Sequence, residues 1–276
     1  MRPVLFQFVL GDVPVTMYSY GTFMVLAWIA GVAVATFAAH RMGLRWQKVL
    51  LLLSLSLMVG IAGSRAFDLW IASAFYADDP SRIFAFDFQG FSLYGGLLLA
   101  GLTGLILSRL WDVPLWRLAD STVPGIATGV VLMRTGCFLN GCCHGGATTL
   151  PWGVTFPAGS PAWTHQLLTG QIDILGAAGL ARPVHPTQLY EMAAVVIMCL
   201  AALWLQHRNM PSGVAFLVFA IGFTLFRIGN GFLRVRQPQI TAPEWFYPVF
   251  YGGLVAIFVG LLLSRLRHRE PQKSDI

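Results

Sequence analysis

Charged residues are scarce in this sequence, where they make up 11% of 276 residues. Soluble domains carry about a quarter of their residues as charged side chains, so an ordinary water-exposed globule is excluded. Hydrophobic residues supply 56% of the chain, including 20 phenylalanines and 9 tryptophans. That composition suits contact with lipid chains and with the membrane–water interface. The sequence therefore predicts a polytopic membrane protein.

Acidic residues are fewer than basic ones, 12 against 18, and the net charge is +6. In a membrane chain the position of Lys and Arg relative to the spans matters more than their sum, so no nucleic-acid partner is expected. Cysteine is rare as well. Only 4 cysteines are present, three of them between positions 137 and 143, and this excludes a disulfide framework.

Long apolar windows of about 20 residues can cross the hydrocarbon core as helices. Seven such windows occur without a soluble segment or repeat between them. We therefore predict an all-α fold with residues 1–276 as one transmembrane domain, preceded by an N-terminal stretch along the membrane surface. Abundant glycine favours close helix–helix contacts. The predicted spans are 18–39, 49–70, 91–110, 116–138, 188–206, 212–234 and 246–266.

Basic residues gather in the loops on one side of these spans. They are Arg41, Arg45, Lys48, Arg109, Arg117, Arg208, Arg265, Arg267, Arg269 and Lys273. The opposite side is nearly neutral apart from Arg182 and from Arg234 and Arg236, which we interpret as headgroup anchors. The positive-inside rule then predicts that the N-terminus is outside and the C-terminus inside.

Polar residues of several spans lie at one depth, in the outer half of the bilayer. Charged groups inside a membrane are costly and usually functional, and here Arg134 and Arg227 fall at a similar level. We interpret Arg65 and Asp68 as a structural pair on one helix face. The remaining polar or glycine positions at this level are Tyr18, Tyr20, Tyr94, Gly95, Gly96, His185, Gln188, Tyr190 and Glu191. Because the inner half is almost purely apolar, an outward-facing site is favoured over a pore.

Two buried arginines at one level need an anionic partner. A guanidinium presents a rigid fork of donors that matches phosphate oxygens. The abundant phosphate in a membrane is the phospholipid headgroup. The residues alone therefore predict a site, open sideways to the outer leaflet, where Arg134 and Arg227 hold a lipid phosphate.

Four motifs, taken in order, resemble those of bacterial prolipoprotein diacylglyceryl transferases. They are "YGGL" at 94–97, "RTGCFLNG" at 134–141, "HPTQLYE" at 185–191 and "FRIGNGFLR" at 226–234. The resemblance covers almost the whole chain. It implies a multi-pass enzyme of the bacterial cytoplasmic (inner) membrane without a cofactor. Its partners would be phosphatidylglycerol and the signal peptide of a preprolipoprotein. The implied reaction moves a diacylglyceryl group to the lipobox cysteine thiol, which forms a thioether and releases glycerol-1-phosphate.

The resemblance also implies a set of site residues. Arg134 and Arg227 would be the catalytic arginines on the lipid phosphate, with Tyr94 and His185 as further catalytic residues. His185 or His144 could take the thiol proton, because the pKa of histidine lies near neutrality. The expected substrate-binding residues are Arg134, Arg227, Gly95, Gly96, Asn140, Gly145, Gln188, Tyr190 and Glu191.

Four positions depart from the family pattern. Tyr94 stands where many members have histidine, Cys137 replaces an asparagine, Cys142 replaces an acidic residue, and Gly231 replaces a glutamate. These changes support a second hypothesis, in which a divergent member moves a glycerolipid group to a different acceptor.

The segment "CFLNGCCH" at 137–144 is open to several interpretations. Adjacent cysteines rarely bind one tetrahedral ion, so the spacing is a poor zinc signature and no metal is expected. A disulfide would suit an oxidising compartment, and small apolar fillers or a lipid-carrying thiol are further alternatives. A non-enzymatic redox or metal-binding membrane protein is the third hypothesis.

Overall fold

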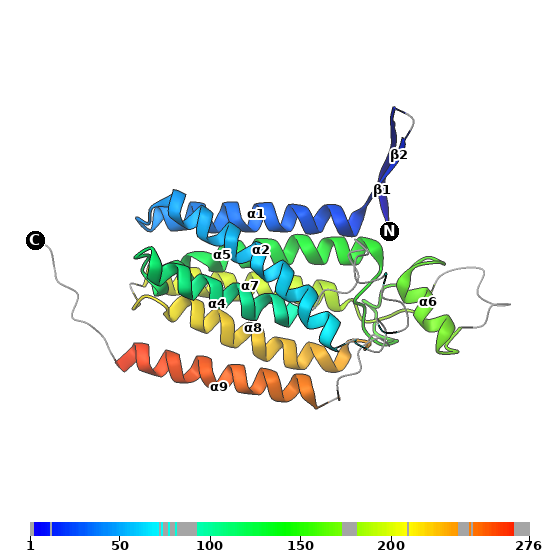
Figure 1. The fold of residues 1–276 in the computed structure, drawn as a ribbon. Helices are drawn as coiled ribbons and strands as arrows, with labels where there is room; N and C mark the ends of the chain where they lie inside the picture. Colours follow the sequence, from blue (N-terminus) through cyan, green and yellow to red (C-terminus); the bar gives the residue numbers. More distant parts are fainter. Residues whose placement is uncertain are drawn as a thin grey trace, which may run out of the picture.

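The structure is a computed structural model. It describes residues 3–11, 13–71, 93–172, 181–208, 210–236 and 245–267, together with the single positions 73, 77, 81 and 243. Long helices run side by side as a bundle, and a smaller region that contains α6 covers one end of it (Figure 1). The first strand and the end of the last helix lie at opposite ends of the bundle (Figure 1).

Helices dominate the described chain, as the apolar windows predict. They are α1 (Ser19–Arg41), α2 (Trp46–Ile71), α4 (Leu93–Leu110), α5 (Leu115–Asn140), α6 (Pro161–Leu168), α7 (Thr187–His207), α8 (Val214–Leu233) and α9 (Phe246–Arg267). Six of these are long and apolar enough to cross a membrane, so the helical, multi-pass membrane class is confirmed. The remaining predicted span, 91–110, coincides with α4, whose apolar part is shorter.

Three elements were not predicted, namely the two strands of a hairpin and a short helix. Strands β1 (Val4–Leu10) and β2 (Val13–Tyr18) form an antiparallel hairpin with Phe8 opposite Val15, and it projects from the start of α1 across the helix direction (Figure 1). The all-α prediction is therefore incomplete at the N-terminus. Short α6 escapes a search for 20-residue windows, although Ser160 caps it and Pro161 opens it. Both signals are typical of a helix start.

Close helix contacts occur at glycines, as expected from their number. A Cβ at Gly125 of α5 would lie 2.4 Å from the carbonyl oxygen of Gly31 in α1. A Cβ at Gly95 of α4 would lie 2.2 Å from the carbonyl oxygen of Gly63 in α2. Only a residue without a side chain permits such backbone approach, so α1 pairs with α5 and α2 pairs with α4.

One end of the bundle is held by a buried carboxylate. Asp120 of α5 accepts hydrogen bonds from the backbone amides of Gly213 (2.7 Å) and Phe216 (2.9 Å) at the start of α8. These amides have no partner within their own helix. A shared apolar core then continues the packing of α5, α7 and α8. Its buried members are Val123, Ala127, Val195, Cys199, Ala202, Ala215 and Phe219.

Three helix ends meet at the opposite end of that core. α5 ends at Gly141, whose φ of 77° turns the chain in the left-handed region. The following loop crosses the start of α7 and the end of α8, because the Gly145 amide donates to the His185 carbonyl and the Gly146 amide to the Leu233 carbonyl, both at 2.9 Å. The loop thus closes the gap between helices that are distant in sequence.

Candidate functional site

The two arginines singled out by depth meet at one carboxylate. Arg134 Nη2 lies 2.9 Å from Glu191 Oε1, and Arg227 Nη1 lies 2.9 Å from Glu191 Oε2. The three side chains come from α5, α7 and α8. The anion that two buried arginines require is therefore supplied first by the protein itself.

This triad is almost sealed from solvent. The side-chain exposures are 6% for Arg134, 2% for Glu191 and 13% for Arg227. Two positive charges against one negative charge leave an excess of +1, in surroundings where charge interactions are weakly screened. Arg227, the most exposed of the three, also directs Nε and Nη2 at the hydroxyl of Tyr251 in α9, each 3.4 Å away. The excess charge is thus most accessible at Arg227.

Several buried polar atoms near the triad have no hydrogen-bond partner among the described residues. They are Arg134 Nε, Gln188 Oε1 and Asn230 Oδ1. The other ends of two of these side chains are fixed, because Gln188 Nε2 donates to the Cys142 carbonyl (2.6 Å) and Asn230 Nδ2 to the Thr187 carbonyl (3.4 Å). Buried polar groups are normally paired, so unpaired atoms of this kind mark places where water or a ligand binds.

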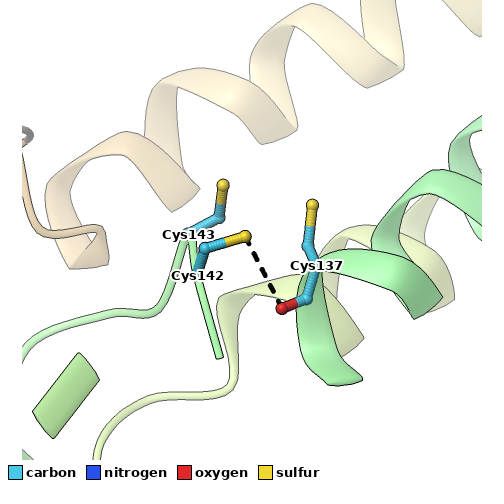
Figure 2. Close-up of side chains that lie close together, drawn as sticks. All are labelled: Cys137, Cys142 and Cys143. Atoms are coloured by element: carbon cyan, nitrogen blue, oxygen red, sulfur yellow. Dashed lines mark hydrogen bonds between the residues drawn. The ribbon is translucent and has the colours of Figure 1, made fainter. Parts of the chain in front are cut away.

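Cys137, Cys142 and Cys143 lie close together where α5 passes into the following loop (Figure 2). Arg134 Nη1 donates to Cys137 Sγ at 3.7 Å, and the Cys142 thiol donates to the Cys137 carbonyl at 3.7 Å. All the cysteines are free thiols. The neighbouring Cys137 and Cys142 thiols, followed by the charges of Arg234 and Arg134, lower the pKa of Cys143. Hydrogen bonding to Cys137 and Cys143, with burial, raises the pKa of Cys142.

A second polar group surrounds the start of α7. Trp152 Nε1 donates to the Tyr190 hydroxyl at 2.8 Å, and His185 Nδ1 lies 3.3 Å from the same oxygen. Tyr190 and His185 therefore form one unit, reached from outside past the exposed Trp152. A histidine oriented by a phenol can accept a proton from an incoming group.

His144 offers a poorer base. Its Nδ1 faces the Gly145 carbonyl at 2.9 Å, and its ring packs 5.6 Å from that of His165. Burial, followed by the charge of His165, lowers the pKa of His144. It is therefore a neutral side chain inside the outer region.

The predicted glycines have packing contacts. Gly95 and Gly96 face α2, with Gly95 directly against Gly63. A Cβ at Gly145 would lie 2.6 Å from the Cβ of His185 and 2.8 Å from the Leu233 carbonyl, which explains glycine where the loop crosses two helix ends. Their substrate-binding role stays a prediction.

The two remaining predicted residues, Tyr94 and Asn140, can be located in their helices. Tyr94 belongs to the first turn of α4, and its side chain lies outside the described residues. Asn140 is the half-buried last residue of α5. The roles of both stay predictions, as do those of Arg134, Arg227 and the residues around them.

Sequence reasoning missed three contributors. Tyr251 reaches Arg227 from α9, Trp152 holds Tyr190, and Thr187 Oγ1 donates to the Cys143 carbonyl at 2.7 Å. Thr187 and Trp152 lie in or near a recognisable motif, but their contacts involve residues 38 to 44 positions away. No local periodicity indicates such pairs.

Comparison with known proteins gives one consistent result. The family model described as prolipoprotein diacylglyceryl transferase matches residues 3–267. A phosphatidylglycerol–prolipoprotein diacylglyceryl transferase of Rhodopirellula baltica is 36% identical over 300 residues, which cover 96% of this chain and 60% of the relative. This chain therefore spans about 60% of that relative's length.

Two further relatives match over most of their own length. The phosphatidylglycerol–prolipoprotein diacylglyceryl transferase of Geobacter sulfurreducens is 30% identical, with 80% of this chain and 79% of the relative covered. The protein named phosphatidylglycerol–prolipoprotein diacylglyceryl transferase 2 in Clostridium perfringens is also 30% identical, with 94% of this chain and 97% of the relative covered.

Proposed function

We propose that this chain, which belongs to the prolipoprotein diacylglyceryl transferase family, transfers the diacylglyceryl group of phosphatidylglycerol to a cysteine thiol of a prolipoprotein. The acceptor is the lipobox cysteine at the end of the signal peptide. The observation that carries the proposal is the pairing of two buried arginines on Glu191 at the outer end of the bundle. This triad combines excess positive charge with rigid orientation.

The donor phosphate binds on the Arg227 side of the triad. The Arg227 side chain is more exposed than that of Arg134, 13% against 6%, and its Nε and Nη2 lie 3.4 Å from the Tyr251 hydroxyl. Arg134 is fixed behind it by Glu191 and Cys137. Arg134 therefore orients the carboxylate and contributes its charge, while Arg227 contacts phosphate oxygens. Fixed positive charge near a departing phosphate stabilises the transition state.

The reaction exchanges one bond at carbon for another. The acceptor sulfur forms a bond to the terminal glyceryl carbon of the lipid, and the bond from that carbon to the phosphate oxygen breaks. Glycerol-1-phosphate leaves with the bonding electrons. The thiol proton passes to a base, for which His185 is the proposed residue because Tyr190 orients it at the open side of the site.

The proposed topology has seven spans in the bacterial inner membrane, with the N-terminus outside. Six long apolar helices and the shorter α4 support a count of seven spans. The position of the site near the start of α1, and at the end opposite the arginine-rich end of α9, supports the orientation. The positive-inside rule gives the same direction. The site then faces the outer leaflet, where phosphatidylglycerol and a translocated signal peptide are both available.

Transfer in vitro tests this function. Purified protein is mixed with phosphatidylglycerol vesicles and a lipobox peptide, and the products are analysed by mass spectrometry. We expect a thioether-linked diacylglyceryl peptide and glycerol-1-phosphate. Consumption of phosphatidylglycerol without any modified lipobox peptide would replace this proposal with transfer to another acceptor.

The two arginines have separable roles in that assay. Arg227→Lys keeps the positive charge but loses the paired N–H donors of the guanidinium. We therefore expect weaker binding of phosphatidylglycerol and a higher KM. Arg134→Lys removes one of the contacts that orient Glu191, so kcat falls. Arg134→Ala and Arg227→Ala should each lower turnover by about 100-fold or more, which is the range for loss of one preorganised hydrogen-bond donor to a developing negative charge. Normal turnover in both alanine variants would refute the phosphate site.

A further inference from the structure

The three clustered cysteines form the strongest feature that the transfer reaction does not use. Their Sγ atoms all lie within 4.8 Å of one another. Cys137 belongs to the last turn of α5, and Cys142 and Cys143 to the loop that follows it (Figure 2). From this convergence we propose that Cys137, Cys142 and Cys143 bind one soft divalent cation of the zinc type through three sulfur ligands.

The backbone explains how two adjacent cysteines can face one ion. Neighbouring side chains in an extended chain point to opposite sides. Cys143, however, has a φ of 62°, a left-handed conformation that is unusual for any residue with a side chain. This turn directs the sulfurs of Cys142 and Cys143 toward Cys137. The geometric objection that the spacing raised against a metal is thereby removed.

The loop is held in this shape by its surroundings. The carbonyl of Cys142 accepts from Gln188 at 2.6 Å, and that of Cys143 accepts from Thr187 at 2.7 Å. Both donors belong to the first turn of α7. With the backbone fixed, metal binding requires only side-chain rotation. Two sulfurs on one zinc ion are about 3.8 Å apart, since each zinc–sulfur bond is about 2.3 Å long. Sulfurs that lie within 4.8 Å of one another therefore need to approach by about 1 Å at most.

Charge and ligand type favour a soft cation. Three thiolates around a divalent ion leave one excess negative charge. Arg134, which donates to Cys137 Sγ, and Arg234, whose charge acts on Cys143, offset it. Among the residues that the structure describes, His144 is not one of those whose ligand atoms converge, and the group consists of the three cysteines. The fourth position of a tetrahedral ion is therefore open to water, and thiolate ligands select zinc-like ions over magnesium or calcium.

Cadmium titration of the full chain in detergent tests the site without using transfer activity. Protein is reduced with a phosphine, freed of metal, and titrated with Cd²⁺ while sulfur-to-cadmium absorption in the ultraviolet is recorded. We expect the band to saturate at one ion per chain. Each thiol that becomes a ligand releases its proton to water, so a weakly buffered sample should acidify in parallel.

Variants assign the signal to these residues. Cys142→Ser with Cys143→Ser should lose the band, while Cys199→Ala keeps it, because Cys199 lies in the apolar core among α5, α7 and α8. An unchanged helical circular-dichroism spectrum shows that the double variant is folded. Saturable absorption that survives the double substitution would overturn the site. So would a disulfide within the cluster in protein purified without reductant, since it would assign these thiols to redox chemistry.

Discussion

At the scale of single residues, Glu191 decides how the arginines can act. Its two carboxylate oxygens each bind a different guanidinium at 2.9 Å. A carboxylate that is shared in this way holds two like charges close together, which their mutual repulsion would otherwise prevent. The same pairing uses one terminal nitrogen of each guanidinium. A lipid phosphate would therefore bind the other N–H groups of the arginines.

Loss of the Glu191 charge should affect stability and turnover together. In Glu191→Gln both buried arginines lose their counter-ion, and breaking a buried ion pair from one side costs about 3–5 kcal/mol. We expect a lower unfolding temperature in detergent and loss of diacylglyceryl transfer. Glu191→Asp keeps the charge and serves as the matched control, with a smaller shift. A glutamine variant as stable as the parent would show that the arginines do not depend on this carboxylate.

At the scale of elements, the outer loop after α5 determines the geometry of the site. It carries Cys142 and Cys143, crosses the start of α7 at His185 and meets the end of α8 at Leu233 and Val235. Three helix ends therefore share one connector. A small displacement of this loop moves Arg134, Glu191 and Arg227 relative to one another, because each lies near the end of a different helix.

Two adjacent glycines provide a direct test of this connector. A methyl group at Gly145 would meet the Cβ of His185 at 2.6 Å and the Leu233 carbonyl at 2.8 Å, whereas nothing lies within 4 Å of one at Gly146. Overpacking of this kind costs about 1–3 kcal/mol. Gly145→Ala should therefore lower transfer and the unfolding temperature, and Gly146→Ala should leave both near the parent values. Equal transfer rates and unfolding temperatures for the two variants would contradict the close contact of the loop with His185 and Leu233.

The inner end of α8 depends on a different contact. Asp120→Ala leaves the amides of Gly213 and Phe216 without their acceptor, a loss worth about 1–3 kcal/mol for buried donors. We expect a lower unfolding temperature in detergent with KM for phosphatidylglycerol unchanged, because the site lies at the other end of the helices. Asp120→Asn retains one acceptor oxygen and should fall between. A large rise in KM would instead indicate that the contact between Asp120 and the start of α8 influences the lipid site.

At the scale of the whole molecule, the polar side chains of the site lie at one end of the bundle. The hairpin β1–β2, the loop after α5 and α6 all lie at the same end as the site (Figure 1). The last turn of α9 carries Arg265 and Arg267 at the other end. This placement suits the proposed topology, in which the lipid donor and the peptide acceptor both approach from the outer face.

Labelling of new cysteines by a membrane-impermeant maleimide checks the orientation. Leu168 of α6 is 80% exposed at the outer end, and exposed Arg41 ends α1 at the inner end. In intact spheroplasts we expect Leu168→Cys to react above the level of the parent chain and Arg41→Cys to react only after permeabilisation. The reverse pattern would place the site on the cytoplasmic face.

Sequence patterns specified the long helices well, since the seven predicted windows begin and end within three residues of the observed α1, α2, α4, α5, α7, α8 and α9. Membrane helices are determined by continuous apolar length, a local property. The family resemblance was confirmed by the match over residues 3–267. The strands and α6 were missed because they are short and lack that length. Arg134, Arg227 and Glu191 could be nominated because charge inside apolar sequence is conspicuous.

The sequence by itself determined that this chain crosses the membrane with helices, that its costly polar groups share one level, and which family motifs it carries. Each of these follows from the composition of a short stretch of chain. Only the tertiary structure decided that Glu191 joins the two arginines, that Tyr251 reaches Arg227, and that three sulfurs converge beside Arg134. Such contacts depend on how separate helix ends approach one another, and this is set by packing across the whole bundle.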